Sequence, residues 1–245
     1  MTSKDKLENP EQYQATVEEV CTTYHKAPDY SEQGVHVVST DEKTGMQALE
    51  RKFPNKPPKQ GKIERIEGEY IRHGTLCLIA SFHVVSGLII ASRIGQTRTE
   101  EDFAEHIRST VEVDPCASWI FIADQLNTHM SESLVRLVAK LCDINDDLGI
   151  KGKRGILKTM ANRRRFLEDK SHRIRFVYTP RHCSWLNQVE IWFSILARRF
   201  LKRGSFESKE DLHERLMKFI EYFNSVLAKP FNWTYTGRPL EAGVR

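Results

Sequence analysis

The stretch RHCSWLNQVEIWFSILARR, residues 181–199, predicts the helix around which the rest of the chain is organised. Its apolar side chains follow the i, i+4, i+7 spacing of one helical face, which indicates a buried stripe. The stripe consists of Trp185, Val189, Trp192, Phe193 and Leu196, and Ser184 is placed to cap the first turn. Glu190 lies at the edge of the stripe, with Asn187 three residues earlier on the same face. A carboxylate in this position raises the question of which other acids of the chain meet it.

The composition is that of a soluble globular protein. The 245 residues are 40% apolar and 29% charged, enough for one large domain or one domain with an insertion. No apolar run approaches ~18 residues, and the first residues lack the apolar segment of a signal peptide. We therefore expect a cytoplasmic protein with no membrane partner. Five scattered cysteines form no CxxC pair, which indicates reduced, mostly buried thiols and neither a disulfide frame nor a zinc site.

The order of apolar runs predicts three strands first and alternating strands and helices afterwards. Residues 35–40 form a β-branched run that ends at Asp41, and residues 119–123 form a continuously apolar run that ends at Asp124. The other predicted strands cover residues 75–85, 88–94 and 174–178, and helices begin near residues 11, 99, 131 and 208. This order gives an α/β fold with a mixed sheet flanked by helices, and it is the order of the ribonuclease H-like fold.

The predicted domain organisation has two parts and one insertion. Residues 1–34 form a polar N-terminal helical extension, and residues 35–245 form the ribonuclease H-like domain. Residues 143–172 interrupt this domain before its last strand, and ten Lys and Arg face two acids between residues 151 and 175. Charge runs often only solvate a surface, but this excess favours non-specific contact with DNA phosphates. The predicted DNA-binding residues are Lys151, Lys153, Arg154, Lys158, Arg163, Arg164 and Arg165.

Asp41, Asp124 and Glu190 occupy three places that converge at one side of such a sheet. Each acid alone has a simpler interpretation, because an Asp after a strand commonly forms a turn and a helical Glu is commonly solvated. Together they suggest a magnesium site, since Mg²⁺ prefers oxygen ligands. Two ions about 3.5–4 Å apart can promote phosphodiester cleavage. We expect Asp41 to bridge two ions, Asp124 to hold one and Glu190 the other.

Three blocks of sequence resemble those of the DDE transposases, in the insertion sequence 630 branch of the mariner superfamily. They are STDEKTGMQALER at residues 39–51, DQLNTH at residues 124–129 and SWLNQVEIWF at residues 184–193. The phrase KPFNWT at residues 229–234 is similar to the C-terminal phrase of that branch. The resemblance covers nearly all of the chain from residue 35 to residue 234, and the third block is its most specific part.

The resemblance implies that Asp41, Asp124 and Glu190 are the catalytic triad and metal ligands of a Mg²⁺-dependent DNA endonuclease and strand transferase. Mn²⁺ is the expected substitute for Mg²⁺, and double-stranded DNA, as element ends and target, is the expected substrate. Synapsis of two ends implies a homodimer. Members of the family carry a helix-turn-helix region ahead of the first Asp, where this chain has 40 residues. The chain therefore resembles the catalytic half alone, and a separate helix-turn-helix partner is expected to read the DNA.

Three further residues are expected to support the triad. His129 contacts the scissile phosphate or orients a ligand water, or else it bonds backbone as a turn histidine. Asn187 steadies Glu190 or a metal-bound water, and Gln125 stands where the family commonly has Asn. Glu42 is expected on the opposite face of the strand from Asp41, in a structural or supporting place.

The interval from Asp124 to Glu190 is 66 positions, longer than is usual in the family, and the insertion at residues 143–172 accounts for the excess. Two alternatives remain open. One is a catalytically silent, truncated transposase remnant that binds DNA or a full-length partner. The other is a ribonuclease H-like nuclease for RNA–DNA hybrids, against which the third block argues.

Overall fold

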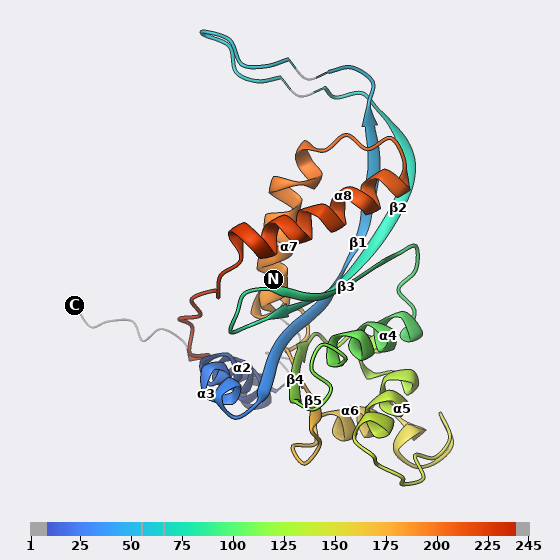
Figure 1. Cartoon of the computed structure of the whole chain (residues 1–245). Coiled ribbons are helices and arrows are strands. Elements are labelled where there is room, and N and C mark those ends of the chain that lie inside the picture. Colours follow the sequence, from blue (N-terminus) through green and yellow to red (C-terminus); the bar gives the residue numbers. More distant parts are fainter. Residues whose placement is uncertain (1–8, 55, 66, 239–245) are drawn as a thin grey trace, which may run out of the picture.

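A five-stranded mixed sheet forms the centre of the computed structural model, which describes residues 9–54, 56–65 and 67–238 (Figure 1). The strands are β1 (Val35–Arg51), β2 (Tyr70–His83), β3 (Ile89–Gly95), β4 (Ser118–Ala123) and β5 (Ile174–Tyr178), in the order β3-β2-β1-β4-β5. β1, β2 and β3 pair antiparallel, whereas β4 and β5 continue the sheet in parallel from the other side of β1. The predicted mixed sheet is confirmed, with the first strand at its centre.

β1 is much longer than the sequence pattern predicts. The prediction that the strand ends at Asp41 is wrong, because β1 continues to Arg51. Its polar second half stays extended because β2 pairs with it as far as Arg51. Pairing with β4 stops earlier, at Ser39. Asp41 therefore lies in mid-strand, just beyond the point at which the parallel half of the sheet ends.

Helices cover both faces of the sheet, as Figure 1 shows. One face packs against α2 (Pro10–His25), α7 (Gln188–Arg199) and α8 (Lys209–Tyr222), and the other against α4 (Glu100–Val111), α5 (Glu132–Leu141) and α6 (Met160–Leu167). Strand alternation produces this division, since Val38 belongs to the core under α4 and α5 and Val37 to the core under α2. The remaining helical segments are α3 (Ala27–Glu32), η1 (Asn127–Met130), η2 (Ile156–Lys158), η3 (Ser184–Leu186), η4 (Leu201–Arg203) and a π-helical turn, η5 (Phe223–Leu227).

The helix predicted near residue 11 is confirmed as α2, and its apolar side chains belong to the core. Asn9 caps its first turn, and Val17, Val20 and Tyr24 are buried. These side chains pack against strand residues of β1, β4 and β5 in one apolar cluster. The described part of the segment predicted as an N-terminal extension thus contributes to the core; residues 1–8 lie outside the described residues.

The helix predicted from residue 184 begins only at Gln188. Ser184 starts the 3-10 turn η3 and does not cap the helix, and Trp185 is 52% exposed, so these two predictions are wrong. The rest of the predicted stripe is buried under β1 and β2. A short turn replaces the first helical turn because other parts of the chain supply the cap of α7, as the site shows below.

Two expectations from composition can be compared with the described residues. None of the described helices is both long and apolar enough to cross a membrane. All five cysteines are free thiols; three are buried, Cys142 is partly buried and Cys116 is exposed.

Gly87 offers a test of how the chain after α8 docks on the β2–β3 turn. Its φ is +73°, and an added Cβ would lie 2.1 Å from the backbone carbon of Lys229. Gly45 has a similar φ of +65° but nothing within 4 Å. The left-handed backbone alone costs about 1–2 kcal/mol for a residue with a side chain. Gly87→Ala should therefore lower the free energy of unfolding clearly more than Gly45→Ala in denaturant titrations. Equal losses would contradict the contact with Lys229.

Candidate active site

The site lies where the parallel pairing of β1 and β4 stops. The last paired residue of β1 is Ser39, two positions before Asp41, and β4 ends at Ala123, directly before Asp124. Beyond these points β1 and β4 are no longer paired, and the two aspartates lie at the edge where the pairing ends. The N-terminus of α7 approaches the same edge and brings Glu190. Asp124 is near enough to act electrostatically on both Asp41 and Glu190, and Asp41 reaches this edge from mid-strand.

Asp41 is held by two hydrogen bonds at an almost fully buried position, with 6% exposure. Its Oδ1 accepts from the backbone N–H of Glu42 at 2.8 Å, and its Oδ2 accepts from Nδ2 of Asn187 at 3.1 Å. Burial, together with the negative charge of Asp124, raises the pKa of Asp41 to about 8. The ionised form of Asp41 is therefore destabilised, and binding of a proton or a cation would relieve this.

Asn187 is the residue that joins α7 to β1. The amide is fully buried, its Nδ2 also donates to the backbone oxygen of Thr40 at 3.0 Å, and its Oδ1 accepts from Ser39 Oγ. The expected support of Glu190 thus takes a different form, because the side chain of Asn187 contacts Asp41 and the β1 backbone. Glu190 benefits indirectly, since it lies one turn further along the helix that Asn187 begins.

Two hydroxyl groups cap α7 from outside the helix. Ser39 Oγ accepts from the backbone N–H of Val189 at 2.8 Å, and the Tyr24 hydroxyl accepts from the N–H of Gln188 at 3.1 Å. These bonds satisfy first-turn donors that a local cap would otherwise take. Neither Ser39 nor Tyr24 was predicted as a site residue, and no local pattern identifies them, because their partners lie about 150 residues away in the chain.

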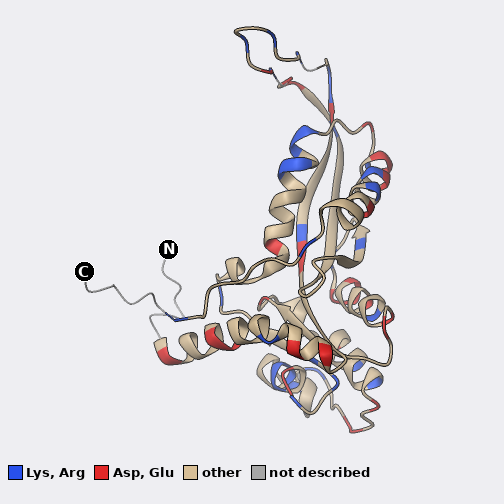
Figure 2. Cartoon of the chain, turned by 60° about the vertical axis from the view of Figure 1, so that its left-hand side comes forward, with Lys and Arg blue, Asp and Glu red and all other residues tan. Residues whose placement is uncertain are grey.

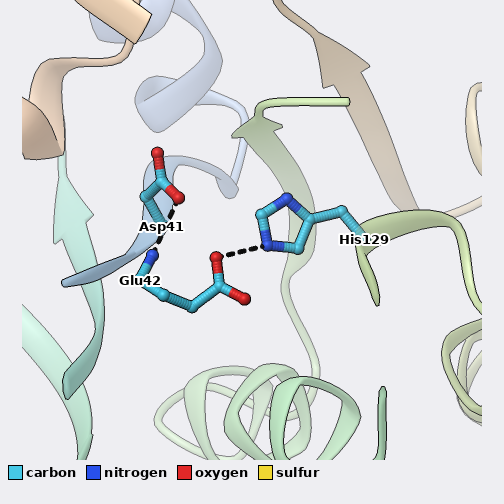
Figure 3. A group of neighbouring side chains, drawn as sticks. All are labelled: Asp41, Glu42 and His129. Atoms are coloured by element: carbon cyan, nitrogen blue, oxygen red, sulfur yellow. Dashed lines mark hydrogen bonds and ion pairs between the residues drawn. The ribbon is translucent and has the colours of Figure 1, made fainter. Parts of the chain in front are cut away.

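His129 bridges two acids. Its Nδ1 lies 2.8 Å from Oδ1 of Asp124. Its Nε2 lies 2.9 Å from Oε2 of Glu42, the contact drawn in Figure 3. Nδ1 also lies 3.2 Å from the backbone oxygen of Asp124, so both ring nitrogens face oxygen acceptors, which favours the protonated ring. Burial lowers the pKa of His129, but the hydrogen bonds to Asp124 and Glu42 outweigh it and raise the pKa to about 10. The predicted support of the triad by His129 would thus act through its contact with Asp124.

Glu42 has a larger part in this arrangement than its place next to Asp41 indicates. Its side chain is 2% exposed and its carboxylate pairs with His129. Asp41, Glu42 and His129 each offer an atom within 4.8 Å of the others, which is close enough for a shared metal ion. His129 is engaged by Glu42 and Asp124, and Asp41 by Asn187 and the backbone N–H of Glu42, so the three residues form a hydrogen-bonded, charge-compensated network.

Asp124 keeps one side of its carboxylate open. Oδ1 accepts from His129 and from the backbone N–H of Leu126 at 2.9 Å, whereas Oδ2 has no hydrogen bond to any described residue. Burial raises the pKa of Asp124, but the hydrogen bond and charge of His129 outweigh it and hold the pKa below its ordinary value. Asp124 is therefore ionised and presents a free oxygen.

Glu190 is half-buried, and its carboxylate has no hydrogen bond or ion pair within the described part of the chain. Burial raises its pKa, the charge of Lys43 lowers it, and the charge of Asp124 raises it again. Asp124 thus acts electrostatically on both Asp41 and Glu190. The buried cation near these three carboxylates is His129, which pairs with Glu42 and Asp124.

The donor set fits a hard divalent cation. Asp41 is destabilised as an anion, and Asp124 and Glu190 have carboxylate oxygens without protein partners. Mg²⁺ and Mn²⁺ favour such oxygen ligands, and a bound cation would relieve the excess negative charge. The site is thus suited to the predicted metal by its chemistry.

Gln125 and an adjoining cleft complete the surroundings. Gln125 Nε2 donates to the backbone oxygen of Thr179 at 2.9 Å, which ties the end of β4 to the end of β5. A cleft of about 450 Å³ opens beside Asp124 and is lined also by Asn127, Met160 and residues 180–184. Gln125 therefore shapes the wall of this cleft.

The basic residues predicted to bind DNA divide into two groups in the structure. Lys151 pairs with Glu100 and Arg154 with Asp147. Arg164 pairs with Glu168, and Arg163 is bound to the backbone oxygens of Met130 and Leu157, so Arg163 has a structural role. The remaining residues are exposed and form no ion pair with any described acid: Lys153, Lys158 and Arg165.

The mixed sheet with the order β3-β2-β1-β4-β5 and helices on both faces is a ribonuclease H-like fold. The chain belongs to the family described as DDE superfamily endonuclease, which matches residues 36–213. A search of curated proteins finds no match to the sequence.

Solved structures of the Mos1 mariner transposase have the same fold. The Mos1 mariner paired end complex with Mn superposes with a TM-score of 0.53 at 12% identity, over 86% of this chain and 56% of that chain. A pre-cleavage Mos1 transpososome gives a TM-score of 0.50 at 12% identity, over 85% and 56%. The Mos1 transposase catalytic domain with Raltegravir and Mn gives 0.50 at 10% identity, over 86% and 82%. The chain thus spans about half the length of the longer Mos1 chains and most of the catalytic domain.

The raised pKa of Asp41 predicts a pH-dependent penalty in the metal-free protein. A carboxyl group whose pKa rises from 3.8 to about 8 on folding gives its stabilisation below pH 3.8 and loses it as the pH approaches 8. Asp41→Asn should therefore melt above the wild type at pH 8, and the difference should shrink toward pH 4. Each kcal/mol regained corresponds to about 2–4 °C for a domain of this size.

Calorimetry in EDTA measures the difference, and added Mn²⁺ should raise the melting temperature of the wild type but not of Asp41→Asn. If the variant melted below the wild type at pH 8, the claim that ionised Asp41 destabilises the folded protein would be wrong.

Proposed function

We propose that this chain is the catalytic domain of a transposase of the insertion sequence 630 branch, which cleaves DNA at element ends and transfers the strands into target DNA. The observation that carries this proposal is the meeting of Asp41, Asp124 and Glu190 at one edge of a ribonuclease H-like sheet. Membership of the DDE superfamily endonuclease family supports it, as does the likeness of the fold to a mariner transposase. The proposed domain comprises residues 35–245, with residues 143–172 as an insertion.

The proposed roles of the three acids follow from their environments. Asp41, the most buried of the three, would be a ligand to both ions, Asp124 would hold one of them and Glu190 the other. Two bound Mg²⁺ ions, or Mn²⁺ in their place, would activate the attacking oxygen and stabilise the leaving oxygen. Asn187 and the Glu42 N–H fix the direction of Asp41. His129 engages one oxygen of Asp124 and leaves the other for the site.

The proposed substrate is double-stranded DNA. Lys153, Lys158 and Arg165 are exposed cations without acid partners among the described residues, and they suit non-specific contact with phosphates. The proposed partners are a second copy of the chain at paired DNA ends and a separate helix-turn-helix protein that reads the end sequence. The catalytically silent alternative is not favoured, because all three acids and their supporting contacts are present.

Cleavage of a plasmid that carries the flanking inverted repeats tests the proposal. Wild-type protein with Mg²⁺ or Mn²⁺ should nick or cut the plasmid at the repeats, and EDTA should stop the reaction. Asp124→Asn and Glu190→Gln should each lose at least ~100-fold in rate, in line with the loss of one group that stabilises transition-state charge. Glu221→Gln, an exposed acid on α8 that has no proposed role, is the matched control and should cleave as the wild type does.

Two outcomes would count against the proposal. One is the absence of cleavage by the wild type even when a helix-turn-helix partner is supplied. The other is normal cleavage by Asp124→Asn or Glu190→Gln, which would remove the site assignment.

A further inference from the structure

A cluster of cations lies at the end of α7 away from Glu190. Arg198 and Arg199 occupy the last turn of α7, and Lys202 and Arg203 follow in η4. All four are exposed, and none forms an ion pair with an acid of the described residues. Figure 2 shows this end of α7 in blue, on the side of the long β1–β2 hairpin. Four like charges within six residues repel one another, so the cluster is unbalanced in the isolated chain.

The cluster borders a broad hollow between α7 and α8. The hollow has a volume of about 1020 Å³ and takes three of its cations from the cluster and a fourth, the exposed Lys229, from the segment after α8. No acid lines it. Tyr222, which is 50% exposed, adds a hydroxyl donor on a partly apolar floor. We call Arg198, Arg199, Lys202, Arg203 and Lys229 the α7 cationic surface.

The helix dipole explains only part of this arrangement. Cations in the last turn of a helix are favourable because they face its partial negative charge, which suits Arg198 and Arg199. The effect falls off within a turn, so it does not extend to Lys202, Arg203 or Lys229. Three elements therefore contribute cations to one hollow without a common structural reason, which points to an anionic ligand.

We propose that the α7 cationic surface binds the phosphate backbone of a DNA duplex whose scissile phosphate lies at the acids. This inference rests on the proposed function and adds the path of the DNA. Glu190 and Arg198 are on one helix, about 12 Å apart along its axis at 1.5 Å per residue. At 3.4 Å per nucleotide step, that is roughly four base pairs. One helix thus joins Glu190 to the cations at its other end, over a distance that a short stretch of duplex can cover.

Charge balance favours this surface over the basic segment predicted from sequence. Among the seven residues predicted there, four are engaged by acids or backbone oxygens of the protein itself. In the α7 cationic surface none of the five is engaged in that way within the described residues. Free guanidinium and ammonium groups are the ones that release counterions from phosphates on binding.

Duplex binding without divalent metal tests the surface apart from catalysis. Anisotropy titrations would use the full chain and a labelled duplex of arbitrary sequence at several salt concentrations. Each phosphate contact contributes about 0.9 to the slope of log K against log salt. The test variant carries the substitutions Arg198→Ala, Arg199→Ala, Lys202→Ala and Arg203→Ala. It should lose roughly 3–4 from that slope and bind every duplex sequence more weakly than the wild type does.

Two further variants make the result specific. Arg→Lys replacements at positions 198, 199 and 203 keep the charge and should keep most of the slope. A control loses two exposed cations from other surfaces that also pair with no described acid, and it should bind as the wild type does; its substitutions are Lys26→Ala and Lys140→Ala. Circular dichroism melts establish that each variant is folded.

Several results would overturn the inference. If the alanine variant kept the wild-type slope and affinity while the wild type cleaved DNA, the proposed function would stand and the surface would be wrong. If the wild type bound poly-glutamate but no duplex, the surface would serve an acidic protein segment. If the wild type bound neither, the surface would not be an anion site. A loss shared equally by the control variant would show only a general charge effect.

Discussion

The buried contact between Asn187 and Asp41 is the constraint on which the rest of the site depends. One amide at the start of α7 meets the carboxylate and the backbone of β1, and Ser39 contacts both this amide and the first turn of the helix. A helix end attached in this way can neither slide nor rotate relative to the strand without leaving buried polar groups unpaired, which costs about 1–3 kcal/mol for each group. Glu190, one turn along, is placed by the same attachment.

The same edge carries more negative charge than the protein neutralises. His129 is the buried cation of the site, and it is shared between Asp124 and Glu42. This sharing favours the ionised form of Asp124 and leaves one of its oxygens without a hydrogen bond to the described residues. Asp41 is left beside an ionised neighbour at 6% exposure, which is why its pKa rises. The fold therefore keeps carboxylates close together with unfavourable electrostatic energy, which a divalent cation would relieve. Such arrangements are common at functional sites.

Sequence patterns identified the elements better than their connections. Apolar periodicity and β-branched runs were enough for the sheet and most helices, because these signals arise from burial on one face. The length of β1 was not predictable in the same way, since its polar second half is extended only because β2 pairs with it. Trp185 was assigned to a buried stripe by spacing alone, and the 3-10 turn before Asn187 shifts it to the surface.

The candidate site residues also differ in whether local sequence patterns identify them. Asp41, Asp124 and Glu190 follow from strand ends, a helix edge and a family resemblance, which are all local signals. The roles of Ser39, Tyr24 and Glu42 depend on partners far away in the sequence, so no window of residues contains them. The basic segment was read from charge count, but a count does not show that Arg163 is bound to backbone oxygens.

The account rests on one claim, that Asp41, Asp124 and Glu190 hold the metal while Glu42 and His129 do not. Anomalous diffraction from crystals soaked in Mn²⁺ tests this claim most directly. The account predicts Mn²⁺ density bounded by oxygens of Asp41, Asp124 and Glu190, with His129 still bridging Asp124 and Glu42. Density coordinated by His129 and Glu42, or no density near Asp41, would contradict it.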